Sequence, residues 1–304
     1  RPGRGEILGK IAAELEKALA RRALEGARGR TSARTLAAGE GWMVRDVLCT
    51  LGPRDRPFEE RHADVCIAMI AAGSFGYRAA AGRELLTPGS LLLGNAGECF
   101  ECGHRHGAGD RCVSVSYTDA YFAQLAADLG VRRGERGFRQ VRVPPLRALS
   151  PLVVRACAGA SGSVQPPWDE LVVELAARTL CVASEHRASV PPPAAAASSR
   201  VAQVARMIDD APHEAHTLDT LARAASMSAF HFLRTFQRVT GVTPHQYVLR
   251  ARIRAAALRL VDDTAKIVDV ALDCGFNDVS NFNHAFRTEF GVSPRAYRAG
   301  AHSV

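Results

Sequence analysis

The spacing of hydrophobic positions changes several times along the chain, and each change predicts a different kind of structure. Residues 5–25 carry apolar side chains at helical spacing, which predicts one amphipathic helix within an N-terminal segment of residues 1–35. From about residue 36 to residue 117 short apolar runs are separated by Gly and Pro, as is typical of closely spaced antiparallel strands. Helical spacing returns over residues 121–129 and 168–186. A β-rich region flanked by helices follows from this pattern.

Three further boundaries complete the predicted organisation. Residues 36–188 are expected to form a small antiparallel β-barrel or jelly roll with flanking helices, which either cover the barrel or form a dimer surface. Residues 189–200 combine three prolines, a run of alanines and serines with no apolar period, and are interpreted as an interdomain linker. Residues 201–304 are helical in pattern. The predicted fold class is therefore α+β with several domains, of which the C-terminal one is all-α.

The C-terminal segment contains an internal repeat with an offset of 50 residues. Each copy has the pattern of a helix-turn-helix: a short helix, a break, and a second helix that ends at a glycine. In the second copy the break is Cys274-Gly275-Phe276, where Gly275 supplies the positive φ that ends a helix cheaply. The recurring positions are Phe232, Phe236, Gly241, Val242, Thr243, Pro244 and Tyr247, which correspond to Phe282, Phe286, Gly291, Val292, Ser293, Pro294 and Tyr297.

A long helix from about Pro244 to Val261 is predicted to join the two units rigidly. Both second helices then reach successive major grooves on one side of a duplex, about 34 Å apart. One arc of each second helix is rich in phenylalanine and is predicted to face inward, whereas the outward arc is suited to contact bases and phosphates. The candidate DNA-binding residues are Phe230, His231, Leu233, Arg234 and Arg238 in the first unit and Ser280, Asn281, His284 and Arg287 in the second.

The stretch from Thr217 to Tyr297 closely resembles the DNA-binding domain of AraC/XylS-family transcriptional regulators, since paired units, connecting helix, Gly-Phe turn and closing Pro-x-x-Tyr occur in order. The resemblance implies sequence-specific, salt-sensitive binding to promoter DNA, usually with RNA polymerase recruited. The β-rich region resembles the cupin-type sensing domain of many such regulators, which binds a small effector and often forms a homodimer. In the family, base contacts come from early outward positions, which fall here on Phe230, Leu233, Arg234, Ser280, Asn281 and His284.

Residues 98–112, which read ECFECGHRHGAGDRC, are the chemically densest segment of the chain. On an extended strand one thiol and two imidazoles share a face, and Asp110 or a cysteine on the next strand completes a set suited to zinc, copper or iron. His-x-His followed by an acid also resembles the first half of the cupin metal motif, whose second half is missing. In the alternative interpretation the cysteines are small buried residues. The candidate metal ligands are Cys102, His104, His106 and Cys112.

Composition narrows the classes of function. Thirty-nine Lys and Arg against 31 Asp and Glu give a formal charge of +8, which favours a polyanionic partner. No apolar run approaches the roughly 20 residues of a membrane span, so we expect a cytoplasmic protein with no membrane partner. Eight scattered cysteines indicate reduced thiols. A Gly-rich phosphate loop and a Gly-x-Ser-x-Gly elbow are both absent, so no enzyme activity is expected. The alternative is a cupin-type metalloenzyme or metal-binding stress protein fused to a DNA-binding module.

Overall fold

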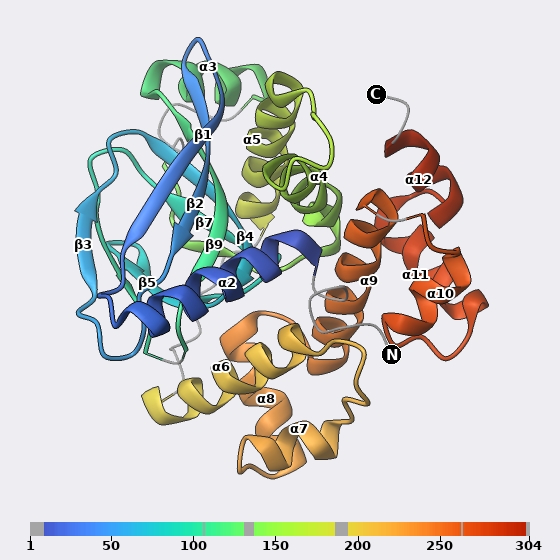
Figure 1. The fold of residues 1–304 in the computed structure, drawn as a ribbon. Helices are drawn as coiled ribbons and strands as arrows, with labels where there is room; N and C mark the ends of the chain where they lie inside the picture. The colour runs from blue at the N-terminus through green and yellow to red at the C-terminus, as the bar shows by residue number, and fades with distance from the viewer. Residues whose placement is uncertain (1–8, 106, 131–136, 186–193, 263, 302–304) are drawn as a thin grey trace.

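The structure, a computed structural model, describes residues 9–105, 107–130, 137–185, 194–262 and 264–301. Two β-sheets with packed helices make up the N-terminal part, and the described elements after it are all helices (Figure 1). The helices of the C-terminal part are α6 (Ala195–Asp210), α7 (Leu218–Ala224), α8 (Ala229–Thr240), α9 (Pro244–Asp262), α10 (Ile267–Asp273), α11 (Val279–Phe290) and α12 (Pro294–Ala301).

Antiparallel strands form the two sheets. The first sheet has the order β1-β2-β9-β4-β7-β10 and the second the order β3-β8-β5-β6. The strands of the first sheet are β1 (Thr31–Gly39), β2 (Trp42–Cys49), β9 (Asp110–Tyr117), β4 (Val65–Gly73), β7 (Leu91–Gly94) and β10 (Arg142–Val143). Those of the second are β3 (Phe58–Arg61), β8 (Cys99–Gly103), β5 (Phe75–Ala79) and β6 (Gly82–Leu86).

Strand β4 shows where the core of the N-terminal part lies. Its sequence is apolar at nearly every position because both faces of the first sheet are covered. Val65, Ile67 and Met69 pack in the cluster formed with the helices. Ala68 and Ile70 point the opposite way and pack between the two sheets. Alternation along one strand thus divides the core into a sheet–helix layer and a sheet–sheet layer.

Helices cover the outer face of the first sheet. They are α2 (Gly9–Glu25), α3 (Asp119–Asp128), α4 (Ser150–Ala160) and α5 (Trp168–Glu185), with a short 3-10 turn, η2 (Arg147–Leu149), before α4. Leu171 and Leu175 of α5 are fully buried in the sheet–helix layer, so these positions cover their own sheet. Within the described residues, every helix is too short or too polar to cross a membrane.

The predicted fold class is confirmed: an antiparallel β domain with helices precedes an all-helical domain. The strands pair as two sheets, which is compatible with the predicted barrel or jelly roll. One detail differs: β1 begins at Thr31, inside the segment of residues 1–35 that was assigned to the N-terminal helix. Strand β1 is an edge strand that is mostly exposed, so its sequence TSARTLAAG carries little apolar alternation for a pattern to detect.

The predicted linker of residues 189–200 lies partly outside the described residues. Residues 195–200 are not irregular, since they form the first turns of α6, which begins at Ala195. Alanine has the highest helix propensity, and Ala197 packs its methyl group in a buried position. The alanine run that suggested a linker is therefore the start of the first helix of the C-terminal part.

The imidazole of His62 provides a pH-dependent test of the sheet–sheet layer. Its Nε2 lies 2.7 Å from Tyr77 Oη, and its ring stacks on Phe100 at a centroid distance of 4.2 Å. Burial lowers the pKa of His62 to about 4. Between about pH 6.5 and pH 4 the unfolded chain therefore binds a proton at His62 that the folded chain does not bind. The folded state loses stability as pH falls through that window.

The unfolding free energy of the native chain should rise between pH 4 and pH 6.5. We expect this rise to be about 1–3 kcal/mol smaller in His62→Gln, which lacks the titrating imidazole. Urea denaturation at a series of pH values measures this difference. Parallel curves for the two proteins would contradict the assignment.

Candidate nucleic-acid interface

The first helix-turn-helix unit consists of α7 and α8. Thr217 begins α7 with a capping box, in which its side chain accepts from Thr220 N and the Thr220 side chain accepts from the Thr217 backbone. Ser226 adopts φ 51° in the turn, and Ser228 then caps α8 by accepting from His231 N. The helix ends at Gly241, whose φ of 82° is left-handed.

The second unit repeats this construction with α10 and α11. Gly275, at φ 88°, occupies the position that corresponds to Ser226 in the first turn. Asp278 caps α11 by accepting from Asn281 N, and the helix ends at Gly291 with φ 76°. The positive φ predicted for Gly275 is confirmed. Both second helices thus begin at a polar cap and end at a left-handed glycine.

Each unit has its own aromatic core, and the two cores match. The rings of Phe236 and Tyr247 meet edge to face at 5.5 Å in the first unit. Phe286 and Tyr297, 50 residues later, meet in the same way at 5.3 Å. Phe232, Phe236, Phe282 and Phe286 are all fully buried. The inward arc predicted from the sequence is therefore the packed face of each second helix.

The opposite face of each second helix is open to solvent. Phe230 is 69% exposed although it is a large apolar side chain, and the guanidinium of Arg234 lies over its ring at 5.7 Å. Of the candidate residues, Leu233 is half-buried and the other eight are exposed: Phe230, His231, Arg234, Arg238, Ser280, Asn281, His284 and Arg287. Arg238 interacts with another part of the chain, and the other exposed side chains are free of core packing.

The two open faces border the same hollow. Leu233 of α8 and Asn281 of α11 both line a cavity of about 490 Å³, whose walls also include the first turn of α9. Helix α9 passes between the two units and packs on both of them (Figure 1). Leu233 and Asn281 therefore lie at one hollow between the two units.

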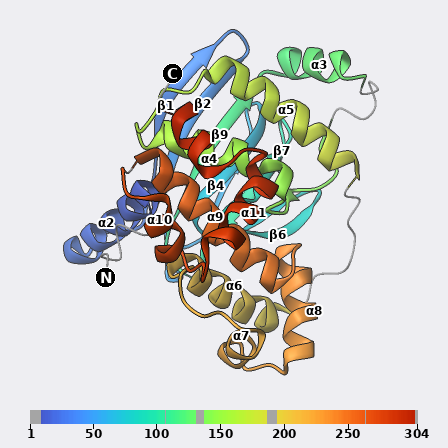
Figure 2. The same cartoon turned by 90° about the vertical axis from the view of Figure 1, so that its right-hand side faces the viewer.

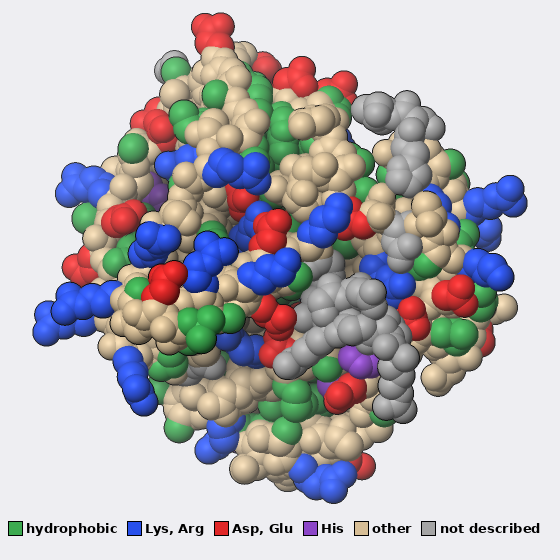
Figure 3. All heavy atoms as spheres, viewed as in Figure 1, with side chains coloured by type: hydrophobic (Ala, Val, Ile, Leu, Met, Phe, Trp, Pro, Cys, Tyr) green, Lys and Arg blue, Asp and Glu red, His purple; other side chains and the backbone are tan. Residues whose placement is uncertain are grey.

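Charge around these faces suits a polyanion. Helix α8 has no carboxylate in its sequence AFHFLRTFQRVT. The carboxylate of α11, Glu289, accepts from Ser150 Oγ and lies 3.7 Å from Arg250 Nε, so it is turned toward the N-terminal part. On the face viewed in Figure 3, basic and acidic side chains are interspersed instead of forming one basic patch. The scarcity of carboxylates in α8 and α11, more than the net charge of the chain, makes these two helices suited to a polyanion.

The C-terminal ends of both second helices are bonded to the N-terminal part. Buried Arg142 of β10 donates to Val239 O in the last turn of α8 at 2.7 Å and pairs with Glu84 at 2.9 Å. In the second unit, Ser150 at the start of α4 donates to Glu289. Sequence reasoning missed these contacts, because residues far apart in the chain give no local signal of their pairing.

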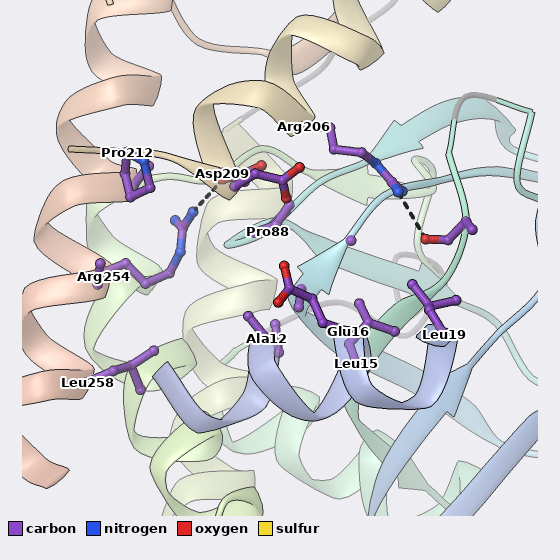
Figure 4. A pocket seen from close by; sticks show the side chains of 17 residues that line it. Ala12, Leu15, Glu16, Leu19, Pro88, Arg206, Asp209, Pro212, Arg254 and Leu258 are labelled. Atoms are coloured by element: carbon purple, nitrogen blue, oxygen red, sulfur yellow. Dashed lines mark hydrogen bonds and ion pairs between the residues drawn. The ribbon is translucent and has the colours of Figure 1, made fainter. Parts of the chain in front are cut away.

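A second hollow lies where the two parts of the molecule meet. It has a volume of about 210 Å³ and is lined by α2, α6, α9 and the end of β4 (Figure 4). Arg254 Nη2 lies 3.2 Å from Asp209 Oδ1, and Tyr247 donates to Asp209 Oδ2 at 2.6 Å. Burial raises the pKa of Asp209 to about 7 against the opposing effect of Arg254. The hollow is therefore lined by charged side chains from α6 and α9 and by apolar side chains from α2.

Three of the four predicted metal ligands are described, and the ligand atoms of these three do not lie within 4.8 Å of one another. Cys102 and Cys112 are buried in the sheet–sheet layer, and burial raises the pKa of both thiols well above the ordinary value. His106 lies outside the described residues. His104 Nε2 is 2.6 Å from Asp110 Oδ1. Burial lowers the pKa of His104, but the hydrogen bonds and charges of Asp110 and Cys49 outweigh it and raise the pKa to about 9.

The match to a known protein family lies in the C-terminal part of the chain. The family described as "Helix-turn-helix domain" matches residues 221–300. The HTH-type transcriptional regulator MtrA of Neisseria gonorrhoeae is 31% identical over 99 residues, which cover 33% of this chain and 33% of that protein. The HTH-type transcriptional activator RhaS of Escherichia coli O139:H28 is 39% identical over 82 residues, covering 27% of this chain and 30% of that one. The chain thus spans about a third of the length of these relatives.

Solved structures match either the C-terminal part or most of the chain. The DNA-binding domain of AdpA in complex with a target DNA is 33% identical and covers 34% of this chain and 94% of its own, with a TM-score of 0.34. ToxT from Vibrio cholerae O395 is 11% identical, covers 88% of this chain and 100% of its own, and has a TM-score of 0.35. Residues 221–300 thus match the helix-turn-helix domain family, and the curated relatives that align with part of this chain are transcriptional regulators.

Proposed function

We propose that the chain is a sequence-specific DNA-binding transcriptional regulator whose N-terminal part senses a chemical signal. One observation carries the proposal: the candidate residues in the early turns of α8 and α11 are mostly exposed, while the aromatic faces of both helices are buried in matching cores. Base edges in the major groove are read by side chains on such a helix face. The family of the C-terminal part supports the same function.

In this proposal one chain occupies a single site of about two helical turns. Helices α8 and α11 enter successive major grooves, and α9 holds their separation. Arg234, Asn281 and His284 read base edges by hydrogen bonds, and Phe230 meets thymine methyl groups. Promoter DNA is then the main partner, with RNA polymerase as the second.

The N-terminal part would act on DNA binding through its contacts with the second helices. Arg142 holds the end of α8 and Ser150 holds the end of α11, so a small shift of the sheets changes the position of both reading helices. A small molecule, a metal or a redox event in the N-terminal part is the proposed signal, and a homodimer is the proposed assembly. An effector that binds one arrangement better shifts the population toward it.

Arg234→Ala tests the reading face of the first unit. We expect affinity for the cognate site to fall by about 1–3 kcal/mol, or roughly 5- to 150-fold, and specificity to relax in one half of the site. Binding titrations with cognate and point-substituted duplexes measure both effects. Arg178→Ala is the matched control, because Arg178 is an exposed arginine of α5, far from both reading helices in sequence. Equal affinities and identical footprints for the two variants would refute the placement.

A further inference from the structure

Three donor groups of different chemistry meet at one end of the sheet–sheet layer. Cys49 ends β2 and Asp110 begins β9, and the two are directly opposite each other in the antiparallel register. His104 follows the last residue of β8 and so approaches from the other sheet. One ligand atom from each residue lies within 4.8 Å of the other two, and all three residues are buried. The group shares His104 with the four candidate ligands predicted from sequence and Asp110 with the alternative considered there, whereas Cys49 was not predicted.

We propose that Cys49, His104 and Asp110 form a binding site for one zinc ion. Zinc binds Cys sulfur at about 2.3 Å and His nitrogen or Asp oxygen at about 2.0–2.2 Å, so neighbouring ligand atoms of a tetrahedral site are roughly 3.3–3.7 Å apart. The three donor atoms reach that spacing with small side-chain movements. One thiolate with one imidazole and one carboxylate suits Zn²⁺, whereas Cu⁺ prefers softer donors and Mg²⁺ or Ca²⁺ prefers oxygen alone.

The local hydrogen bonding leaves room for such an ion. His104 Nε2 lies 2.6 Å from Asp110 Oδ1, so the ring nitrogen that faces the carboxylate is the one that would bind the ion, with zinc in place of the proton of this hydrogen bond. Thr31, paired with Cys49 across β1 and β2, places its hydroxyl 3.6 Å from Cys49 Sγ and orients the sulfur. The cluster is thus held from two sheets.

The segment between two of these ligands is also the contact point of α6. Arg206 Nη1 donates to Ala108 O at 2.9 Å, and Nη2 lies 3.4 Å from Gly109 O (Figure 4). At Gly107 a Cβ atom would lie 2.1 Å from the guanidinium carbon of Arg206, so glycine permits this packing. His104 Nε2 and Asp110 Oδ1 are 2.6 Å apart without an ion, so an ion bound between them moves the two residues apart and repositions the carbonyl groups that hold α6. This regulatory step rests on the proposed function, whereas zinc binding itself does not.

Metal analysis of the purified full-length chain tests the site. We expect close to one zinc per chain, and a thiolate-to-cobalt charge-transfer band when Co²⁺ replaces zinc. Cys49→Ser should abolish the band. His104→Gln should weaken zinc binding by about 10- to 100-fold, because losing a residue that only supports a ligand already has an effect of that size. Cys157→Ser is the matched control, because Cys157 is a buried cysteine of α4 on the other face of the first sheet.

Circular dichroism melting of each variant separates loss of ligand from loss of fold. A folded Cys49→Ser protein that still shows the thiolate band would overturn the site. So would a band that disappears in Cys102→Ser or Cys112→Ser but survives in Cys49→Ser, since the ligands would then be those predicted from sequence.

DNA titration with and without zinc tests the regulatory step. We expect zinc to change cognate affinity by about 5- to 150-fold, the range of ordinary allosteric coupling. Arg206→Ala should keep stoichiometric zinc and lose this coupling. An equal zinc effect in the native chain and in Arg206→Ala would overturn the route through α6. A chain that binds zinc but no DNA under any condition would refute the proposed function and leave the zinc site standing.

Discussion

Phe282→Ala should lower the free energy of unfolding by about 3–5 kcal/mol, because it removes a fully buried ring from the second aromatic core. Phe282 packs against Phe276 at 5.1 Å and Phe286 at 5.6 Å, so truncation leaves a cavity between two helices that must stay in register. Urea denaturation followed by circular dichroism measures the loss. Footprinting should also show that protection is lost at one half of the DNA site.

Phe230→Ala is the control for this prediction, because Phe230 is a phenylalanine of the first unit that is 69% exposed. We expect its unfolding free energy to change by about 0.5 kcal/mol or less, since exposed positions contribute little to stability. Its affinity for DNA should fall if the ring contacts a thymine methyl group. Similar unfolding free energies for the two variants would show that the inward and outward faces have been assigned incorrectly.

Arg111→Leu should lower the unfolding free energy by a similar amount, about 3–5 kcal/mol, because it leaves the buried carboxylate of Asp46 with only the largely exposed Arg34 as a partner. Arg111 Nε and Nη2 each donate to Asp46 at 2.8 Å, and only 5% and 7% of the two side chains are exposed. Arg111 also donates to Ile11 O and pairs with Glu14, which attaches α2 to the first sheet. Thermal and urea denaturation measure the effect, with detachment of α2 detected by hydrogen exchange.

The matched control is Arg78→Leu, which removes an ion pair at the surface. Arg78 pairs with Glu101, but half of its side chain is exposed to solvent. Exposed pairs contribute about 0–1 kcal/mol, so the unfolding free energy should barely change. If Arg78→Leu destabilised the protein as much as Arg111→Leu, burial would not be the reason for the strength of the Arg111–Asp46 pair.

The helical half of the molecule could be predicted in detail because its signals are local. Caps, glycine stops and an apolar period of 3.6 residues lie within a few positions of the structure they specify. The turn of the first unit illustrates the limit of this approach. Ser226 adopts a positive φ where the second unit uses Gly275, and no residue preference at Ser226 indicates this. Only the repeat aligns the two turns.

The N-terminal half was predictable as a class but not in its pairing. Strand β1 was missed because an exposed edge strand has no apolar alternation. Cys49 was not among the candidate ligands, because its partner Asp110 is set by antiparallel register across 61 positions of sequence. Arg142 likewise meets Val239 only through tertiary packing. Contacts of this kind depend on how the sheets and helices are stacked, and single-sequence patterns contain no information about that.

Hydroxyl-radical footprinting on a site selected from random duplexes tests the central claim most directly. The account predicts two protected blocks on one face of the duplex, about 10–10.5 base pairs apart, for each bound chain. Arg234→Ala should weaken one block and His284→Ala the other. A single protected block, or uniform protection that neither substitution changes, would contradict the placement of α8 and α11 as paired readers of DNA.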